Sequence, residues 1–143
     1  MNKTRVLFLC TENSARSQMA EAFLRYYGSD QYEAYSAGLE PGGINPLTEK
    51  VMAEKGIILE NQYSKDISEY LGKVHFSYLI TVCSNAEERC PSTFPGVSRR
   101  LSWGFDNPAA IDGGIEEKLE KFRVVRDQIE EQIKGWLSQQ DLK

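Results

Sequence analysis

The amino-terminal run Val6–Leu9 constrains the fold of this chain more than any other feature of its sequence. Its four residues are all apolar, without the polar alternation of a half-exposed strand. A continuous run of this kind is typical of a strand buried on both faces of a parallel sheet. The run Tyr78–Val82 repeats the pattern later in the chain. The two runs therefore predict neighbouring strands inside a parallel sheet.

Residues with helical periodicity separate and follow these runs. Asn45 and Pro46 predict a helix start, because Asn is a favourable N-cap and Pro suits the first turn, and Gly56 is placed to end that helix. Because strands alternate with helices, we expect a single α/β domain over residues 1–143. The remaining predicted elements are a helix over Met19–Tyr27 ended by Gly28, extended stretches at Tyr32–Ala37 and Arg99–Trp103, and a long helix with the apolar stripe Ile115, Leu119, Phe122, Val125, Ile129, Ile133 and Trp136.

Composition limits the classes of function. The chain has 143 residues and a net charge of −4, so a broad basic surface for nucleic acid is not expected, and an anionic substrate needs a local positive site. No stretch approaches the roughly 18 apolar residues of a membrane span. Three unevenly spaced cysteines indicate free thiols rather than a disulfide scaffold. We expect a cytoplasmic, monomeric protein that binds neither nucleic acid nor membrane.

The segment between the first strand and the first helix, Cys10–Ser17, is the strongest candidate for a functional site. Ligands of parallel sheets bind beyond the carboxyl ends of the strands, where Cys10 stands. A turn of this kind directs backbone N–H groups inward above a helix N-terminus, and Asn13 tolerates the left-handed backbone of such a nest. We expect Arg16 to bind two oxygens of a tetrahedral anion. The predicted oxyanion-binding residues are Thr11, Glu12, Asn13, Ser14, Ala15, Arg16 and Ser17.

The same surroundings predict a reactive thiol. N–H donors and Arg16 are expected to lower the pKa of Cys10 from its free value of about 8.5, which gives a nucleophilic thiolate at neutral pH. Ser17 is placed to donate a hydroxyl proton to that thiolate. The alternative for Cys10 alone is a buried structural cysteine. The full order of strand, Cys, five residues, Arg-Ser and helix favours the functional interpretation.

The segment Cys10–Ser17 resembles the Cys-x5-Arg-Ser signature of low-molecular-weight protein tyrosine phosphatases and of the thioredoxin-coupled arsenate reductases that share their fold. Its continuation through Ala22, together with Tyr35–Gly38, is similar to the reductase branch. The resemblance implies a three-layer fold in which helices flank both faces of a four-stranded parallel sheet. It also implies an enzyme that reduces arsenate, with phosphate or sulfate as competing anions and no cofactor.

Two further cysteines extend the resemblance. In the reductases, a first thiolate attacks arsenate, a second cysteine releases arsenite by forming a disulfide, and a third moves that disulfide to where thioredoxin or a similar dithiol protein reduces it. Matched onto this chain, the order is Cys10, Cys83, Cys90. If residues 85–90 are helical, a Cys83–Cys90 bridge requires that segment to unwind. The alternative is a pair of small buried residues, and the spacing does not indicate a metal site.

The chain departs from its relatives at the position of the general acid. The family has an Asp immediately before a Pro, whereas this chain has Asn107 before Pro108. Asn cannot deliver a proton, so the neighbouring Asp106 is a catalytic candidate if the loop turns it toward Cys10. The alternative is that Asn107 and Pro108 only form a turn.

A second departure concerns a cation. Some relatives bind potassium through residues that match Asn13, Glu21 and Ser36, together with an Asp where this chain has Lys65. We expect the Lys65 ammonium to take the place of the cation and to neutralise Glu21. The alternative is an exposed lysine without a role.

Three functions therefore remain open at this level. The first is arsenate reduction by the three-thiol relay. The second is phosphate-ester hydrolysis by a low-molecular-weight phosphatase, which the Cys83 and Cys90 pair and Asn107 disfavour. The third is a non-catalytic domain that binds oxyanions or senses redox state.

Overall fold

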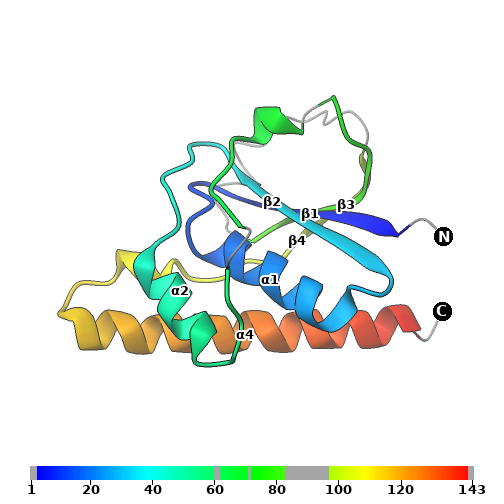
Figure 1. Ribbon diagram of the computed structural model, residues 1–143. Helices are drawn as coiled ribbons and strands as arrows, with labels where there is room; N and C mark the ends of the chain where they lie inside the picture. The colour runs from blue at the N-terminus through cyan, green and yellow to red at the C-terminus, as the bar shows by residue number, and fades with distance from the viewer. Residues whose placement is uncertain (1–2, 60–61, 71, 83–96, 142–143) are drawn as a thin grey trace.

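The computed structural model describes residues 3–59, 62–70, 72–82 and 97–141. Its centre is a four-stranded sheet in the order β2-β1-β3-β4, and every pairing is parallel (Figure 1). The predicted fold class, an α/β domain with a four-stranded parallel sheet, is confirmed. The strands are β1 (Thr4–Cys10), β2 (Tyr32–Gly38), β3 (Phe76–Thr81) and β4 (Val97–Ser102).

Three α-helices lie beneath the sheet in the view of Figure 1, and a short 3-10 turn, η1, lies above it. Among the described residues no helix has the length and apolar character needed to cross a membrane. The helical elements are α1 (Arg16–Gly28), α2 (Pro46–Ala53), α4 (Ile115–Asp141), η1 (Ile67–Glu69) and a second 3-10 turn, η2 (Pro108–Ala110).

The boundaries of the helices follow the local signals. Asn45 caps α2 by accepting from the Leu47 N–H, and Gly56 has the positive φ of a helix terminator, as predicted. Gly28 is the last residue of α1, so the predicted end of this helix is confirmed, although Gly28 has no positive φ. A Cβ there would lie 3.2 Å from side-chain atoms of Leu137 and Leu24, so its smallness serves the α1–α4 contact.

The hydrophobic core lies between the sheet and the helices. The run Val6–Leu9 is fully buried, as expected for a central strand. The apolar stripe of α4 is buried from Leu119 onward, whereas Ile115 is 62% exposed, which corrects the predicted start of the stripe. The first residue of a helix often precedes the point where its axis meets the core, so periodicity alone extends such a stripe too far.

The sheet order determines what surrounds Cys10. Because β1 lies between β2 and β3, the chain after β2 and the chain after β3 both pass the end of β1. The Val82 N–H donates to Leu9 O, and the Phe105 N–H donates to Val82 O. These bonds bring the segment after β4 to the same edge of the sheet as the loop that follows Cys10.

Candidate active site

A small cavity lies at the carboxyl end of β1. Its volume is about 130 Å³, and Cys10, one of the residues that line it, is 3% exposed. The cavity lies where the strand ends and a helix begins, which is the place where the topology of parallel sheets predicts a ligand. The lining residues are Cys10, Thr11, Glu12, Ser14, Ala15, Arg16 and Asn107.

The loop over residues 10–15 holds all its carbonyl groups away from this cavity. Each carbonyl oxygen accepts a hydrogen bond from a group that does not line the cavity. Because these carbonyl oxygens are bonded outside, they do not present negative charge to the enclosed space, as an anion-binding nest requires. The donors, in order from Cys10 O to Ala15 O, are Leu39 N, Glu40 N, Gly42 N, Gln18 Nε2, Asn45 N and Met19 N.

Asn13 supplies the left-handed turn that the nest requires. Its φ is 53°, the only positive value at a non-glycine position in the described part of the chain. The fully buried side chain donates to Ser17 Oγ at 2.7 Å and accepts from the Lys65 N–H at 2.9 Å. The predicted left-handed backbone of Asn13 is thus confirmed, and both the NH₂ group and the oxygen of its side-chain amide form hydrogen bonds.

Gly38 permits the close approach of the loop to β2. It pairs with Cys10 across the sheet, and a Cβ at this position would lie 2.8 Å from Thr11 O and 2.9 Å from Asn13 N. The sequence analysis used Gly38 only as part of a resemblance and missed this packing role. A glycine at the end of a buried strand was the available signal, because such a residue often marks a close backbone contact.

Arg16 presents an unused hydrogen-bond donor. Its Nη1 donates to Phe105 O at 2.9 Å, which fixes the orientation of the guanidinium. Its Nε is buried and has no hydrogen-bond partner within the described ranges. A buried, unpaired nitrogen of a charged group is costly, and native proteins rarely keep one without a ligand. The side of the guanidinium that carries Nε is therefore available to bind an anion in the cavity.

The N-terminus of α1 adds to this positive site. The helix begins at Arg16, and the residue at its N-cap, Ala15, offers no side-chain acceptor. The first N–H groups of a helix have no intrahelical partner and attract negative charge. Ser17 is fully buried and its Oγ accepts from Asn13, which leaves its hydroxyl proton for another acceptor. Donation of that proton to Cys10 stays a prediction.

The structure does not bring Asp106 into the cavity. Its carboxylate is 76% exposed and forms an ion pair with Lys121 of α4 at 3.0 Å. Asn107 lines the cavity instead, and its side chain caps η2 by accepting from the Ala109 N–H at 3.1 Å. Adjacent residues in an extended segment point apart, so the chain cannot offer both side chains to Cys10. No carboxyl group from this segment reaches the cavity.

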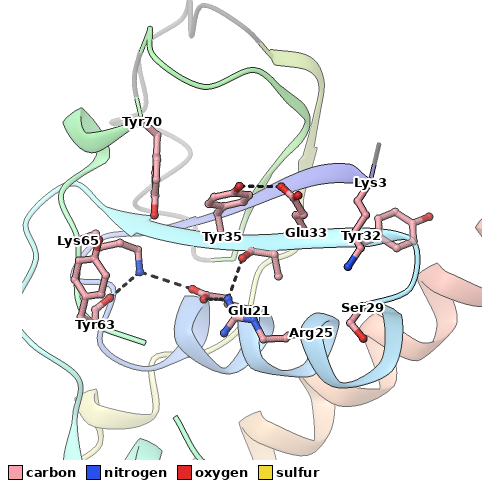
Figure 2. Close-up of a pocket in the computed structure, with 11 residues that line it drawn as sticks. Lys3, Glu21, Arg25, Ser29, Tyr32, Glu33, Tyr35, Tyr63, Lys65 and Tyr70 are labelled. Atoms are coloured by element: carbon pink, nitrogen blue, oxygen red, sulfur yellow. Dashed lines mark hydrogen bonds and ion pairs between the residues drawn. The ribbon is translucent and has the colours of Figure 1, made fainter. Parts of the chain in front are cut away.

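Lys65 is buried beside Glu21. The side chain is 4% exposed, and its Nζ lies 3.7 Å from Glu21 Oε1 and 2.7 Å from Tyr63 O. Figure 2 shows this ammonium directed toward Glu21, which Arg25 also contacts. Burial lowers the pKa of Lys65, and the charge of Glu21 opposes that shift. The interpretation of Lys65 as an exposed residue without a role is wrong.

The Glu21–Lys65 ion pair also lines a second cavity, of about 480 Å³, beside β2 (Figure 2). In the part of the chain that the structure describes, no group of three His, Cys, Asp or Glu side chains is placed to hold a metal ion.

Cys83 and Cys90, the predicted second and third thiols, lie outside the described residues, as does the segment predicted to unwind between them.

The sequence analysis also missed two buried side chains that hold the loop from outside. Thr48 of α2 donates from Oγ1 to Ser14 O at 2.9 Å, and Gln18 of α1 donates from Nε2 to Asn13 O at 3.0 Å. Both are fully buried. A polar residue on the apolar face of a predicted helix was the signal, because buried polar groups need partners.

Comparisons with known proteins show the family of this chain. The family described as low molecular weight phosphotyrosine protein phosphatase matches residues 5–143. A curated protein of Halalkalibacterium halodurans, named arsenate reductase, is 46% identical over 94% of this chain and 95% of its own length. The arsenate reductase of Bacillus subtilis is 44% identical with the same coverage of both chains.

Solved structures show the same fold. One titled as an arsenate reductase in the phosphate binding state has a TM-score of 0.76 at 28% identity, over 95% of this chain and 98% of its own. A tyrosine phosphatase of Erwinia amylovora, at 15% identity, has a TM-score of 0.74 over 96% of this chain and 93% of its own. Because the family matches residues 5–143, nearly the whole chain, this chain belongs to the low molecular weight phosphotyrosine protein phosphatase family.

Proposed function

We propose that this protein reduces arsenate to arsenite by a relay of three cysteine thiols, Cys10, Cys83 and Cys90. The observation that carries the proposal is the buried, unpaired Nε of Arg16 beside Cys10. Cys10 lines a cavity that has a hydrogen-bond donor available for an oxyanion. A thiol in this position is suited to attack the central atom of the anion. The curated relatives named arsenate reductase support the choice of arsenate.

In the first step the Cys10 thiolate attacks arsenic and forms a sulfur–arsenic bond. Loop N–H groups and Arg16 hold the arsenate oxygens and stabilise the charge that develops on them. One oxygen leaves as water after protonation. Since Asn107 cannot donate a proton and Asp106 faces Lys121, that proton comes from the substrate or solvent.

In the second step Cys83 attacks the sulfur of Cys10. The sulfur–sulfur bond forms while the sulfur–arsenic bond breaks, and its electron pair leaves with arsenic, which is reduced from the +5 to the +3 state. Cys90 then attacks Cys83, which frees the Cys10 thiolate and leaves a Cys83–Cys90 bridge. A dithiol protein such as thioredoxin reduces that bridge. One similar solved protein, from Corynebacterium glutamicum, is titled a thioredoxin-dependent arsenate reductase.

The proposal is tested by counting thiols after incubation with arsenate alone. The wild type should lose two thiols for each arsenite formed. Cys83→Ser should release no arsenite, because the arsenic adduct on Cys10 has no thiol to displace it. Cys90→Ser is the matched control, since it should still form one arsenite and lose two thiols but should not turn over with thioredoxin. Arsenite release by Cys83→Ser would refute the relay.

An assay of aryl-phosphate hydrolysis separates the other functions. Phosphate release without thiol loss would identify a phosphatase, and neither reaction would identify a binding domain. The lack of an acid at Asn107 disfavours the phosphatase, because the alkoxide that leaves a phosphate ester needs a proton.

The need to keep three thiols reduced supports the cytoplasm as the place of action. We expect residues 1–143 to act as one monomeric domain.

A further inference from the structure

Gln18 occupies an unusual position for a polar side chain. Gln18 is the third residue of α1, and its side chain is fully buried between the loop that follows Cys10 and the segment after residue 61. A buried carboxamide is costly unless its donors and acceptor are all paired. Its partners therefore indicate what it does.

All of these groups are paired, and the partners fix the orientation of the amide. Nε2 donates to Asn13 O at 3.0 Å and to Tyr63 O at 3.0 Å, and Oε1 accepts from Gln62 Nε2 at 2.7 Å. Both acceptors of Nε2 are carbonyl oxygens, so a flipped amide would set oxygen against oxygen. The carboxamide is thus a bridge from the segment that carries Tyr63 to a single peptide group of the loop.

That peptide group joins Asn13 to Ser14. In a planar, trans peptide the C=O and the N–H point in opposite directions. When Gln18 holds Asn13 O on the outside of the loop, the Ser14 N–H is directed to the opposite side. Ser14 lines the cavity above Cys10, so the N–H directed inward is one of the groups that would bind the oxyanion.

The left-handed conformation of Asn13 makes this restraint important. Non-glycine residues adopt a positive φ only at a cost, and they keep it where surrounding contacts enforce it. If the Asn13 carbonyl rotated inward, it would present negative charge to the anion and to the Cys10 sulfur. The neighbouring carbonyl of Ser14 is held separately, by Asn45 N and Thr48 Oγ1.

We propose that Gln18 is a positioning residue of the oxyanion site, which sets the direction of the Ser14 N–H through the Asn13–Ser14 peptide. The inference rests on the proposed function, since it assumes that the cavity binds an oxyanion. Gln18 itself touches neither substrate nor thiol.

The test compares Gln18→Met with the matched control Ala22→Gly. Met keeps the length of the side chain but removes both donors. Ala22→Gly weakens the same helix at a buried position, and no hydrogen bond described above joins Ala22 to the loop. Gln18→Met should bind inorganic phosphate about tenfold more weakly by calorimetry, as expected for lost hydrogen bonds to the loop. Its KM for arsenate should rise by a similar factor, and the pH midpoint of Cys10 alkylation should move upward.

Ala22→Gly should lower the Tm of unfolding without changing phosphate affinity, KM or the alkylation midpoint. A third variant, Gln18→Glu, has the same shape but presents a carboxylate to Asn13 O, and only its protonated form can donate. Its defect in sulfate binding, relative to the wild type, should therefore shrink as the pH falls from 8 to 5. Sulfate suits this comparison because it keeps its charge over that range.

The outcomes are distinct. If the wild type binds phosphate and Gln18→Met binds it equally well with an unmoved alkylation midpoint, the role of Gln18 is refuted and the proposed function stands. If Ala22→Gly loses as much affinity as Gln18→Met, the role of Gln18 is likewise refuted, because general loosening of α1 then explains the effect. If the wild type binds neither phosphate nor arsenate, the proposed function itself fails.

Discussion

The two walls of the Cys10 cavity are built in different ways. The first wall, the loop 10–17, has every carbonyl of residues 10–15 occupied and is supported by buried side chains. The second wall, the segment 105–108, is exposed at Asp106 and Asn107. It is held by the Arg16 bond to Phe105 O and by an exposed ion pair with Lys121.

This difference separates two tasks of the site. Binding an oxyanion needs donors fixed before the ligand arrives, and the first wall supplies them. Delivering a proton needs a titratable group at the cavity, and the second wall offers only the amide of Asn107. We infer that the first wall is suited to nucleophilic attack on an anion, whereas the second wall has no acid for an ester leaving group.

The largest effect should come from breaking the first wall at its charged end. Arg16→Lys keeps a positive charge but loses the planar fork, and we expect kcat/KM for arsenate to fall by roughly 100-fold or more. Arg123→Lys is the control and should change activity less than about twofold, because Arg123 of α4 forms a partly exposed pair with Glu54, the C-cap of α2. A drop of under fivefold for Arg16→Lys would mean that the loop N–H groups alone bind the anion.

The next effect tests the second wall. Asn107→Asp should raise aryl-phosphate hydrolysis by about 100-fold, because it places a carboxyl group where the second wall offers only an amide. Asp106→Asn is the matched control, since this carboxylate faces Lys121, and it should leave both activities within about twofold. Loss of arsenate reduction in Asp106→Asn would show that Asp106 reaches the substrate after all.

A smaller effect is expected where the first wall meets the sheet. Gly38→Ala forces a Cβ to within 2.8 Å of Thr11 O, so the loop must shift. We expect a loss of about 2 kcal/mol in the free energy of unfolding and a KM for arsenate raised by about tenfold. Gly104→Ala, whose Cβ would meet no atom within 4 Å, is the control for glycine replacement. Equal KM values in the two variants would contradict the close-packing argument.

The smallest effects compare the two ion pairs. Lys65→Met leaves buried Glu21 with fewer partners and should cost about 2 kcal/mol of stability in urea unfolding. Lys121→Met, on the exposed pair, should cost under about 0.5 kcal/mol.

Because Lys65 already supplies the cation beside Glu21, wild-type activity should be equal in potassium and sodium at fixed ionic strength. Strong stimulation by potassium would contradict this role of Lys65.

Several features could be predicted because neighbouring residues decide them. The buried run Val6–Leu9, the Asn45 cap and the left-handed Asn13 all follow from local sterics and hydrogen bonding. The start of α1 directly after the Cys10 loop follows in the same way. These features place a thiol, a nest and a helix N-terminus together before any tertiary contact is known.

Other features depend on residues far apart in the chain. Asp106 pairs with Lys121 of α4 whereas Asn107 lines the cavity, and no local pattern could reveal this arrangement. The close approach of Gly38 to the loop and the bridge from Gln18 to Tyr63 O likewise arise only when the strands are in register.

By itself, the sequence determined that Cys10 ends a buried strand and begins an anion-binding turn, because strand burial and turn conformation depend on short-range sterics. The tertiary structure decided that the unpaired Arg16 Nε and Asn107 lie at that turn, and that the ammonium of Lys65 lies beside Glu21. The physical reason is that an exposed side chain has many rotamers of similar energy, and only contacts from distant segments select one of them.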